Sequence, residues 1–131
     1  MITKHKSDDA VRVRSEDVEK SLVHVEFAQM CFKEAGCTSG IAGCLFYLGT
    51  LRNTKREYAN ARQKLKEALR LYEHLDHTVA KMITYELLNR IARSLNLTKE
   101  IVEYSDLVKS KPGDAKHKRV GRFLIHKGGK Y

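Results

Sequence analysis

The sequence predicts an all-α fold of about five helices, arranged as antiparallel helix-turn-helix repeats in a superhelix or as a small bundle. The 131 residues include one proline. Apolar residues recur at intervals of three and four, and strand-like alternation is rare. The helical segments of about 12 to 20 residues are joined by turns of about two to four, which makes neighbouring helices antiparallel. A chain of this length favours one domain.

The first helix is expected to begin at Ser15, whose hydroxyl can cap the first turn, and to end at Gly36. Its apolar stripe comprises Val18, Leu22, Val25, Ala28, Phe32 and Ala35. Residues 1–14 are polar and without period, so we expect a flexible N-terminal arm. The second helix, expected over 38–53, is apolar on most sides and should therefore pack between two neighbours.

The third helix has the clearest start, because Thr54 and Glu57 have the spacing of a capping box. Its apolar face comprises Tyr58, Ala61, Leu65, Ala68, Leu69, Tyr72 and Leu75. A fourth helix over 78–95 carries Ala80, Ile83, Leu87, Leu88, Ile91 and Ala92. A fifth helix over 99–109, capped by Thr98, completes a helical domain over 15–110. Pro112 cannot continue a helix, so residues 111–131 form a basic C-terminal tail.

One spacing occurs twice in the chain. The arrangement of Ala28, Phe32 and Ala35 recurs as Ala61, Leu65 and Ala68, with Leu48, Gly49 and Tyr58 placed before the second set. This pattern resembles the tetratricopeptide repeat, about 34 residues of helix-turn-helix with a Leu-Gly pair in its first helix. The resemblance covers about residues 18–109 and is fullest in the middle repeat. Arg52 departs from it, since the family has a bulky apolar residue there, and an ordinary helical bundle stays the alternative.

The resemblance implies a groove that binds an extended peptide or a helix of a partner protein. The matching positions are Phe46, Thr50 and Asn53 on the second helix and Glu86, Arg90 and Arg93 on the fourth. Arginine offers a planar fork for carboxylates, so an acidic partner is expected. The alternative is that the two arginines form an ordinary solvated face. Small residues such as Gly49 and Ala61 would mark places where helices approach closely.

No residue pattern indicates catalysis. The spacing of Cys31, Cys37 and Cys44 matches no usual zinc site, and the histidines pair with no nucleophile, so no metal, cofactor or enzymatic activity is expected. An odd number of cysteines argues for a reducing compartment. The N-terminus lacks a signal peptide, and the longest nearly uncharged stretch is too short to span a bilayer. We expect a cytoplasmic protein, or a nuclear one if the source is eukaryotic.

The positive charge is concentrated at the C-terminus. Residues 109–131 carry eight basic residues and one acidic residue, and so account for seven units of the net charge of +9. The basic tail residues expected to bind a partner are Lys116, Lys118, Arg119, Arg122, Lys127 and Lys130. Phe123-Leu124-Ile125 lies among them and could pack on the domain or on another copy. The basic residues of the third helix, Lys55, Arg56, Arg62, Lys64, Lys66 and Arg70, are expected to form a solvated face.

These observations favour a non-catalytic protein–protein interaction module, an adaptor, scaffold or chaperone-like subunit. It would bind a peptide or helix in the groove and use the tail for an acidic partner. A thin stack of repeats exposes apolar sides, so homo-oligomerisation is also expected. The alternative is a nucleic-acid-binding accessory protein that acts through the tail, where basic residues would contact phosphates and aromatic residues would stack on bases.

Overall fold

The computed structural model describes residues 3–110, and of residues 3–15 it describes the helical backbone only. Five helices follow one another: α1 (Thr3–Ala35), α2 (Thr38–Thr54), α3 (Tyr58–His74), α4 (Thr78–Ser94) and α5 (Thr98–Lys109). No strand occurs within these residues. The predicted all-α fold of about five helices is therefore confirmed. The predicted tail, residues 111–131, lies outside the described residues.

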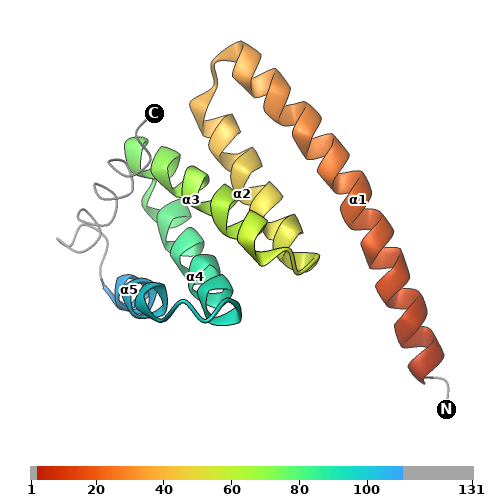
Figure 1. Cartoon of the computed structure of the whole chain (residues 1–131). Helices are drawn as coiled ribbons and strands as arrows, with labels where there is room; N and C mark the ends of the chain where they lie inside the picture. The colour runs from red at the N-terminus through yellow and green to blue at the C-terminus, as the bar shows by residue number, and fades with distance from the viewer. Residues whose placement is uncertain (1–2, 111–131) are drawn as a thin grey trace.

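Each helix packs mainly against the helix before it and the helix after it (Figure 1). The chain reverses direction at the turns after α1, α2 and α3, whereas α5 crosses α4 and is seen nearly along its axis in Figure 1. The helices α1 and α5 lie at the two ends of the stack, and each has one helix as its main neighbour. As predicted from its apolar composition, α2 packs between α1 and α3. The stack leaves one side of each end helix without a helical neighbour among the described residues.

The start of α1 differs from the prediction. The helix expected to begin at Ser15 begins at Thr3, so most of the segment predicted as a flexible arm belongs to α1. The residues before Gly36 include neither glycine nor proline, and nothing in the sequence breaks the helix there. The predicted end is correct, since α1 ends at Ala35 and Gly36 adopts a left-handed conformation with φ of 69°.

The four turns between helices share one geometry. Gly36, Arg56, Asp76 and Asn96 have positive φ, between 53° and 69°, and are equally spaced along the chain. At each turn the next residue along the chain donates its N–H to a carbonyl five residues earlier, as Glu57 does to Arg52 at 2.9 Å. This is the Schellman arrangement, which satisfies the last carbonyls of a helix. The three inner helices, each of 17 residues, are therefore joined by equivalent turns.

The predicted capping box before α3 is wrong. Thr54 is the last residue of α2, and its hydroxyl donates to the carbonyl of Thr50 at 3.1 Å. Glu57 occupies the N-cap position of α3 but makes no side-chain capping bond, because its carboxylate accepts from Arg52 at 2.8 Å. The capping-box spacing is therefore present in the sequence, but neither side chain caps α3. The Thr54 side chain bonds within α2, and the Glu57 side chain bonds to Arg52 of α2. The predicted cap at Thr98 is also wrong, since Thr98 is the first residue of α5 and follows its N-cap.

The core consists of three clusters along the stack. The first joins α1 to α2 through Val18, Leu22, Leu48 and Leu51. The second joins α2 to α3 through Ala42, Leu45, Ala68, Leu71 and Tyr72. The third joins α3, α4 and α5 through Ala61, Leu65, Leu69, Tyr85, Leu88, Ile91, Tyr104 and Leu107. Ile83, predicted for the core, is 48% exposed, whereas Lys81 and Thr84 on the same helix are buried.

The small residues mark close helix contacts, as predicted. A Cβ added at Gly49 would lie 2.6 Å from Cγ of Leu65 and 3.3 Å from the carbonyl oxygen of Ala61. Ala61 and Ala68 are fully buried. Larger side chains at these positions would push α2 and α3 apart.

The spacing of the turns also bears on the resemblance. A helix pair measured between equivalent turns, as from Gly36 to Asp76, occupies roughly 40 residues, whereas the tetratricopeptide repeat is shorter, at about 34. The observed helix pair is thus longer than the tetratricopeptide repeat, and the resemblance stays a prediction.

Candidate interaction surfaces

A groove lies between α4 and α5 at one end of the stack. Its volume is about 340 Å³, and it is lined by Glu86, Asn89, Arg90, Ser105, Val108 and Lys109. The lining positions on each helix are spaced by one, three or four residues, so they share a face. The exposed side chains of Arg90 on α4 and Lys109 on α5 place a positive charge on each wall, and exposed Glu86 adds a negative charge on the α4 wall. Half-buried Val108 adds an apolar surface on the α5 wall.

Asn89 fixes the two walls of this groove. Its Nδ2 donates to the carbonyl of Ile101 at 3.0 Å and to Oγ of Ser105 at 2.9 Å, both on α5. Its Oδ1 accepts a hydrogen bond from Nε of Arg93 at 3.0 Å. Both ends of the amide are therefore engaged. Asn89 couples α4 to α5 and orients Arg93 along the same surface.

The structure brings together only some of the predicted groove residues. Glu86 and Arg90 line the α4–α5 groove, and Arg93 is bonded to a residue of its wall. Phe46, Thr50 and Asn53 lie half-buried on α2 and are not among the lining residues. Phe46 packs against two core clusters, and the Thr50 hydroxyl donates to the Phe46 carbonyl.

Four lining residues, Asn89, Ser105, Val108 and Lys109, were not among the predicted site residues. Asn89 stands four residues before Arg93, a spacing that permits a side-chain hydrogen bond on a helix. This spacing could have identified Asn89 from the sequence as a neighbour of the predicted site residue Arg93. No local pattern pairs Asn89 with Ser105, because that contact depends on the angle at which α5 packs on α4.

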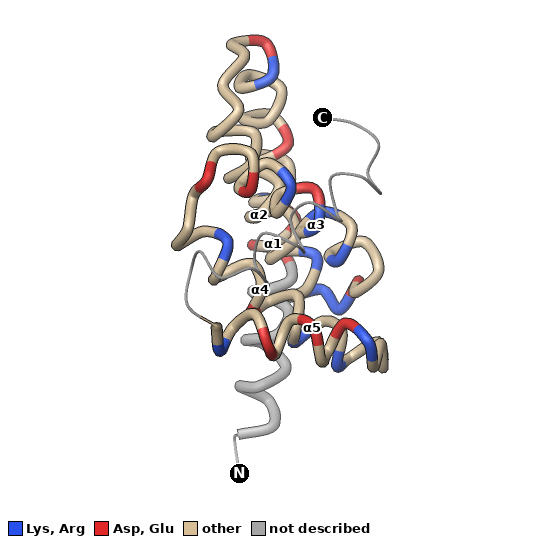
Figure 2. The backbone as a smooth tube through the Cα atoms, turned by 90° about the vertical axis from the view of Figure 1, so that its left-hand side faces the viewer, with Lys and Arg blue, Asp and Glu red and all other residues tan. Residues whose placement is uncertain are grey.

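The basic surface of α3 is not simply solvated. Arg62 and Lys66 lie half-buried against Glu100 of α5. Nε of Arg62 donates to Oε1 of Glu100 at 3.0 Å, Nη2 bonds the other carboxylate oxygen, and Nζ of Lys66 lies 3.6 Å from Oε2. Figure 2 shows acidic positions along α5, with a basic position near each of its ends. Part of the predicted solvated face therefore holds two helices together.

Glu100 shows the electrostatic effect of this cluster. Burial alone would raise the pKa of its carboxyl group, but the hydrogen bonds from Arg62 and the positive charge of Lys66 outweigh burial and lower it. Burial in turn lowers the pKa of Lys66. A carboxylate with two cationic partners is thus held ionised, so this cluster stabilises the packing of α5 and offers no free acid or base.

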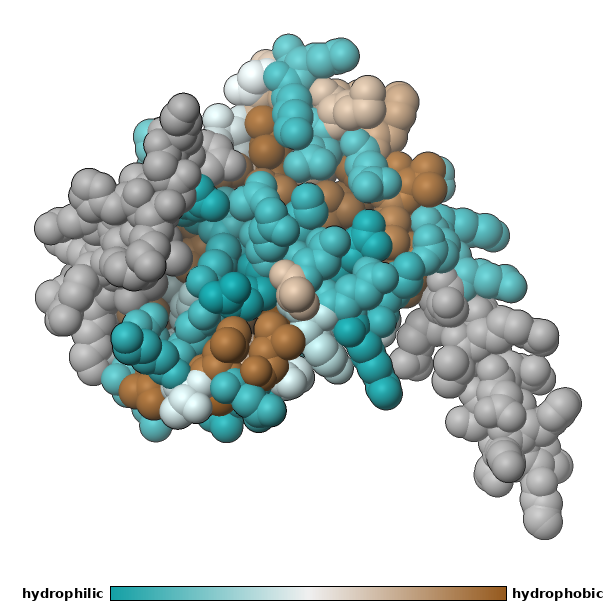
Figure 3. Space-filling model, in the orientation of Figure 1, coloured by the Kyte–Doolittle hydropathy of each residue, from teal (hydrophilic) through white to brown (hydrophobic). Residues whose placement is uncertain are grey.

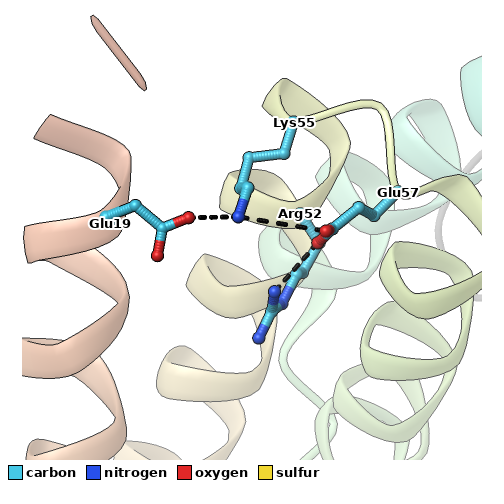
Figure 4. A network of polar contacts seen from close by, with 4 residues as sticks. All are labelled: Glu19, Arg52, Lys55 and Glu57. Atoms are coloured by element: carbon cyan, nitrogen blue, oxygen red, sulfur yellow. Dashed lines mark hydrogen bonds and ion pairs between the residues drawn. The ribbon is translucent and has the colours of Figure 1, made fainter. Parts of the chain in front are cut away.

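A second ion-pair cluster ties α1 to the turn after α2 (Figure 4). Lys55 bonds Glu19 of α1, and Arg52 Nη1 lies 2.8 Å from Glu57 Oε1. Lys55 Nζ is also 3.9 Å from Oε2 of Glu57. The hydrogen bond from Lys55 lowers the pKa of Glu19. Lys55, predicted for the solvated basic face, is thus a contact between helices.

Lys81 is the most deeply buried charge whose partners the structure shows. Its side chain on α4 is 8% exposed and lies 3.6 Å from Oε2 of Glu73 and 3.7 Å from Oδ1 of Asp76. Glu73 is 16% exposed. A buried charge needs such partners, so this pair positions α4 against the end of α3.

A second groove, more apolar than the first, lies between α1 and α2. Its volume is about 400 Å³, and it is lined by His24, Val25, Ala28, Phe32, Gly40, Gly43, Cys44 and Tyr47. The predicted apolar stripe of α1 is thus only partly covered, since Phe32 is 36% exposed. Figure 3 shows brown, hydrophobic atoms at the surface in the region where α1 runs in Figure 1.

The described residues show neither a metal cluster nor a membrane span. Within residues 16–110 no three His, Cys, Asp or Glu side chains are grouped so that they could hold a metal ion. No helix of the described part is long and apolar enough to cross a membrane. Comparison of the chain with known protein families, curated proteins and solved structures finds no match.

Proposed function

We propose that this protein is a non-catalytic interaction module that binds an acidic segment of a partner protein in the groove between α4 and α5. The observation that supports it is the placement of Arg90 and Lys109 on opposite walls of the groove, beside apolar Val108. A peptide or helix with a carboxylate and an apolar side chain matches both features. The module would then serve as an adaptor, a scaffold or a chaperone-like subunit.

The position of Lys109 extends the proposal to the tail. Lys109 lines the groove and is also the first of the eight basic residues in 109–131. A partner segment bound in the groove would therefore meet further positive charge where the chain continues. Long-range attraction of this kind raises the rate of association and weakens as salt increases.

The test is an affinity purification with the full chain followed by mass spectrometry. Lys33→Glu is the matched control for Lys109→Glu, since both lysines are exposed in the last turn of a helix and lie at opposite ends of the stack. We expect Arg90→Glu and Lys109→Glu to lose partners that Lys33→Glu retains. Unchanged recovery by Arg90→Glu combined with Arg93→Glu would show that the groove assignment is wrong.

The competing function is nucleic-acid binding through the basic tail. It rests on the concentration of charge in residues 109–131 and on the aromatic residues among them. A shortened chain ending at Lys111 separates the two functions. On the groove proposal, partner recovery persists in the shortened chain, although weakened. On the competing proposal, binding of a labelled single-stranded RNA is steeply salt-dependent in the full chain and is lost on truncation.

A further inference from the structure

The outer face of α1 carries an apolar stripe with no covering helix among the described residues. Val23, Phe27 and Met30 are 65%, 66% and 59% exposed. Their spacing of four and three residues puts them on one face of the helix. Phe27 lies nine residues after buried Val18, which is about half a turn around the helix axis. The stripe therefore points away from α2.

The two ends of the stripe carry opposite charges. Lys20 stands seven residues before Phe27 and Glu34 stands seven residues after it, and both are exposed. Seven residues are two turns of a helix, so both lie on the same face as Phe27. Exposed Cys31 lies on this face too. The face is thus a seam of apolar residues between a cation and an anion.

We propose that a second copy of this chain covers this face, with the two α1 helices antiparallel and the two-fold axis at Phe27. In that arrangement each Lys20 lies opposite the partner's Glu34, and the two Phe27 rings meet at the centre. A parallel pairing would instead place lysine against lysine and glutamate against glutamate. The charges therefore select the antiparallel arrangement, as charges beside a coiled-coil seam do.

The size of the face fits a reversible dimer. Since an aromatic side chain offers about 150–250 Å², the exposed side chains of the stripe and its ends offer roughly 500 Å² per copy. Two copies would bury on the order of 1,000 Å² in total, near the lower limit for a specific interface. A dissociation constant in the micromolar range is expected. The interface is at the opposite end of the stack from the α4–α5 groove, so dimerisation and partner binding are independent proposals.

Sedimentation equilibrium of the full chain over micromolar concentrations tests the dimer. We expect Val23→Lys to be monomeric and the control Val102→Lys to behave as the unmodified chain, since Val102 is 57% exposed on α5. Both positions are exposed, so both variants should fold, and circular dichroism checks this. A monomeric unmodified chain at all concentrations would overturn the proposal, and so would equal weakening by the two lysine substitutions.

Charge reversal tests the antiparallel order. Lys20→Glu places like charges opposite each other at two symmetric positions and should raise the dissociation constant about tenfold. Adding Glu34→Lys restores opposite charges and should restore the affinity. The proposed order is wrong if the double variant dimerises no better than Lys20→Glu alone.

A disulfide tests the register. The antiparallel pairing centred on Phe27 places position 23 opposite Cys31 of the partner subunit. In a chain with Cys37→Ser and Cys44→Ala, Val23→Cys should form a covalent dimer on mild oxidation in air, and adding Cys31→Ser should abolish it. A non-covalent dimer of the Val23→Cys chain that does not cross-link would show that the register differs.

Discussion

Arg62 of α3 and Glu100 of α5 are joined by two hydrogen bonds although they stand 38 residues apart in the sequence. Most packing in this stack is between consecutive helices, so this pair is an exception that reaches past α4. It holds α5 from the side of α3 while Asn89 holds it from the side of α4. The walls of the α4–α5 groove depend on both contacts.

The first prediction concerns this pair and pH. Glu100→Gln should lower the free energy of unfolding at pH 7 by about 1–2 kcal/mol, because two cations lose their partner. The control Glu103→Gln, at an exposed position of the same helix, should change it by less than about 0.5 kcal/mol. Urea unfolding followed by circular dichroism measures both.

The same pair predicts the direction of the pH dependence. The pKa of Glu100 is lower in the folded chain than its ordinary value of 4.5. Its contribution to stability is therefore complete above that value and is lost as pH falls through the folded pKa. The difference in unfolding free energy between the unmodified chain and Glu100→Gln should shrink as the pH is lowered from 6 to about 3. A difference that grows on acidification would contradict this assignment.

The second prediction compares two glycines of α2. Gly49→Ala should destabilise the protein by about 1–3 kcal/mol, because the new methyl group would collide with Leu65. Gly43→Ala should stabilise it by up to about 1 kcal/mol, since nothing lies within 4 Å of an added Cβ and alanine favours helix. Thermal unfolding of both variants gives the comparison. Equal effects would mean that α2 and α3 are not in close contact at Gly49.

The third prediction concerns the turns. Arg56 has φ of 63°, a conformation that glycine adopts without strain, so Arg56→Gly should stabilise the protein by about 0.5–1 kcal/mol. Gly36→Ala should destabilise the protein by about 1 kcal/mol, because alanine is strained at the φ of 69° that Gly36 adopts. No neighbour crowds an added Cβ at this position, so the effect reports the backbone strain. Denaturant midpoints report both signs. Loss of stability in Arg56→Gly would mean that the arginine side chain contributes more than the backbone strain removes.

The fourth prediction concerns the relative reactivity of the Cys37 and Cys44 thiols. A hydrogen bond with Ser39, at an Sγ–Oγ distance of 3.6 Å, lowers the pKa of Cys37 at the N-cap of α2. Burial raises the pKa of the Cys44 thiol. Iodoacetamide at pH 7.5 should therefore modify Cys37 well before Cys44, and Ser39→Ala should slow the reaction of Cys37. Peptide mass spectrometry over time measures the order, and faster labelling of Cys44 would contradict it.

Much of the fold could be predicted from local patterns. The C-terminal end of α1, the length of α4 and the close contact at Gly49 follow from helical spacing and from glycine chemistry. The turns at Arg56, Asp76 and Asn96 were harder to recognise, because these residues adopt the left-handed conformation less readily than glycine. The equal interval between turns was therefore hidden in the sequence.

The surfaces were less predictable than the helices. Arg62 and Lys66 have the spacing of an ordinary basic helix face, and only the packing of α5 brings Glu100 to them. Ile83 fits the apolar pattern of α4, yet Lys81 is buried instead because Glu73 and Asp76 neutralise it. Contacts between residues far apart in the chain decide these cases, and a local pattern does not contain them.

The equal spacing of the turns has a consequence for how such a chain can change in length. Gly36, Arg56, Asp76 and Asn96 end their helices in the same way, so each unit of one helix and one turn begins and ends with the same backbone geometry. Insertion or removal of two units, which together make one helical hairpin, would leave the geometry of the remaining turns unchanged. The stack can therefore grow or shrink in hairpins while its two ends keep their separate surfaces.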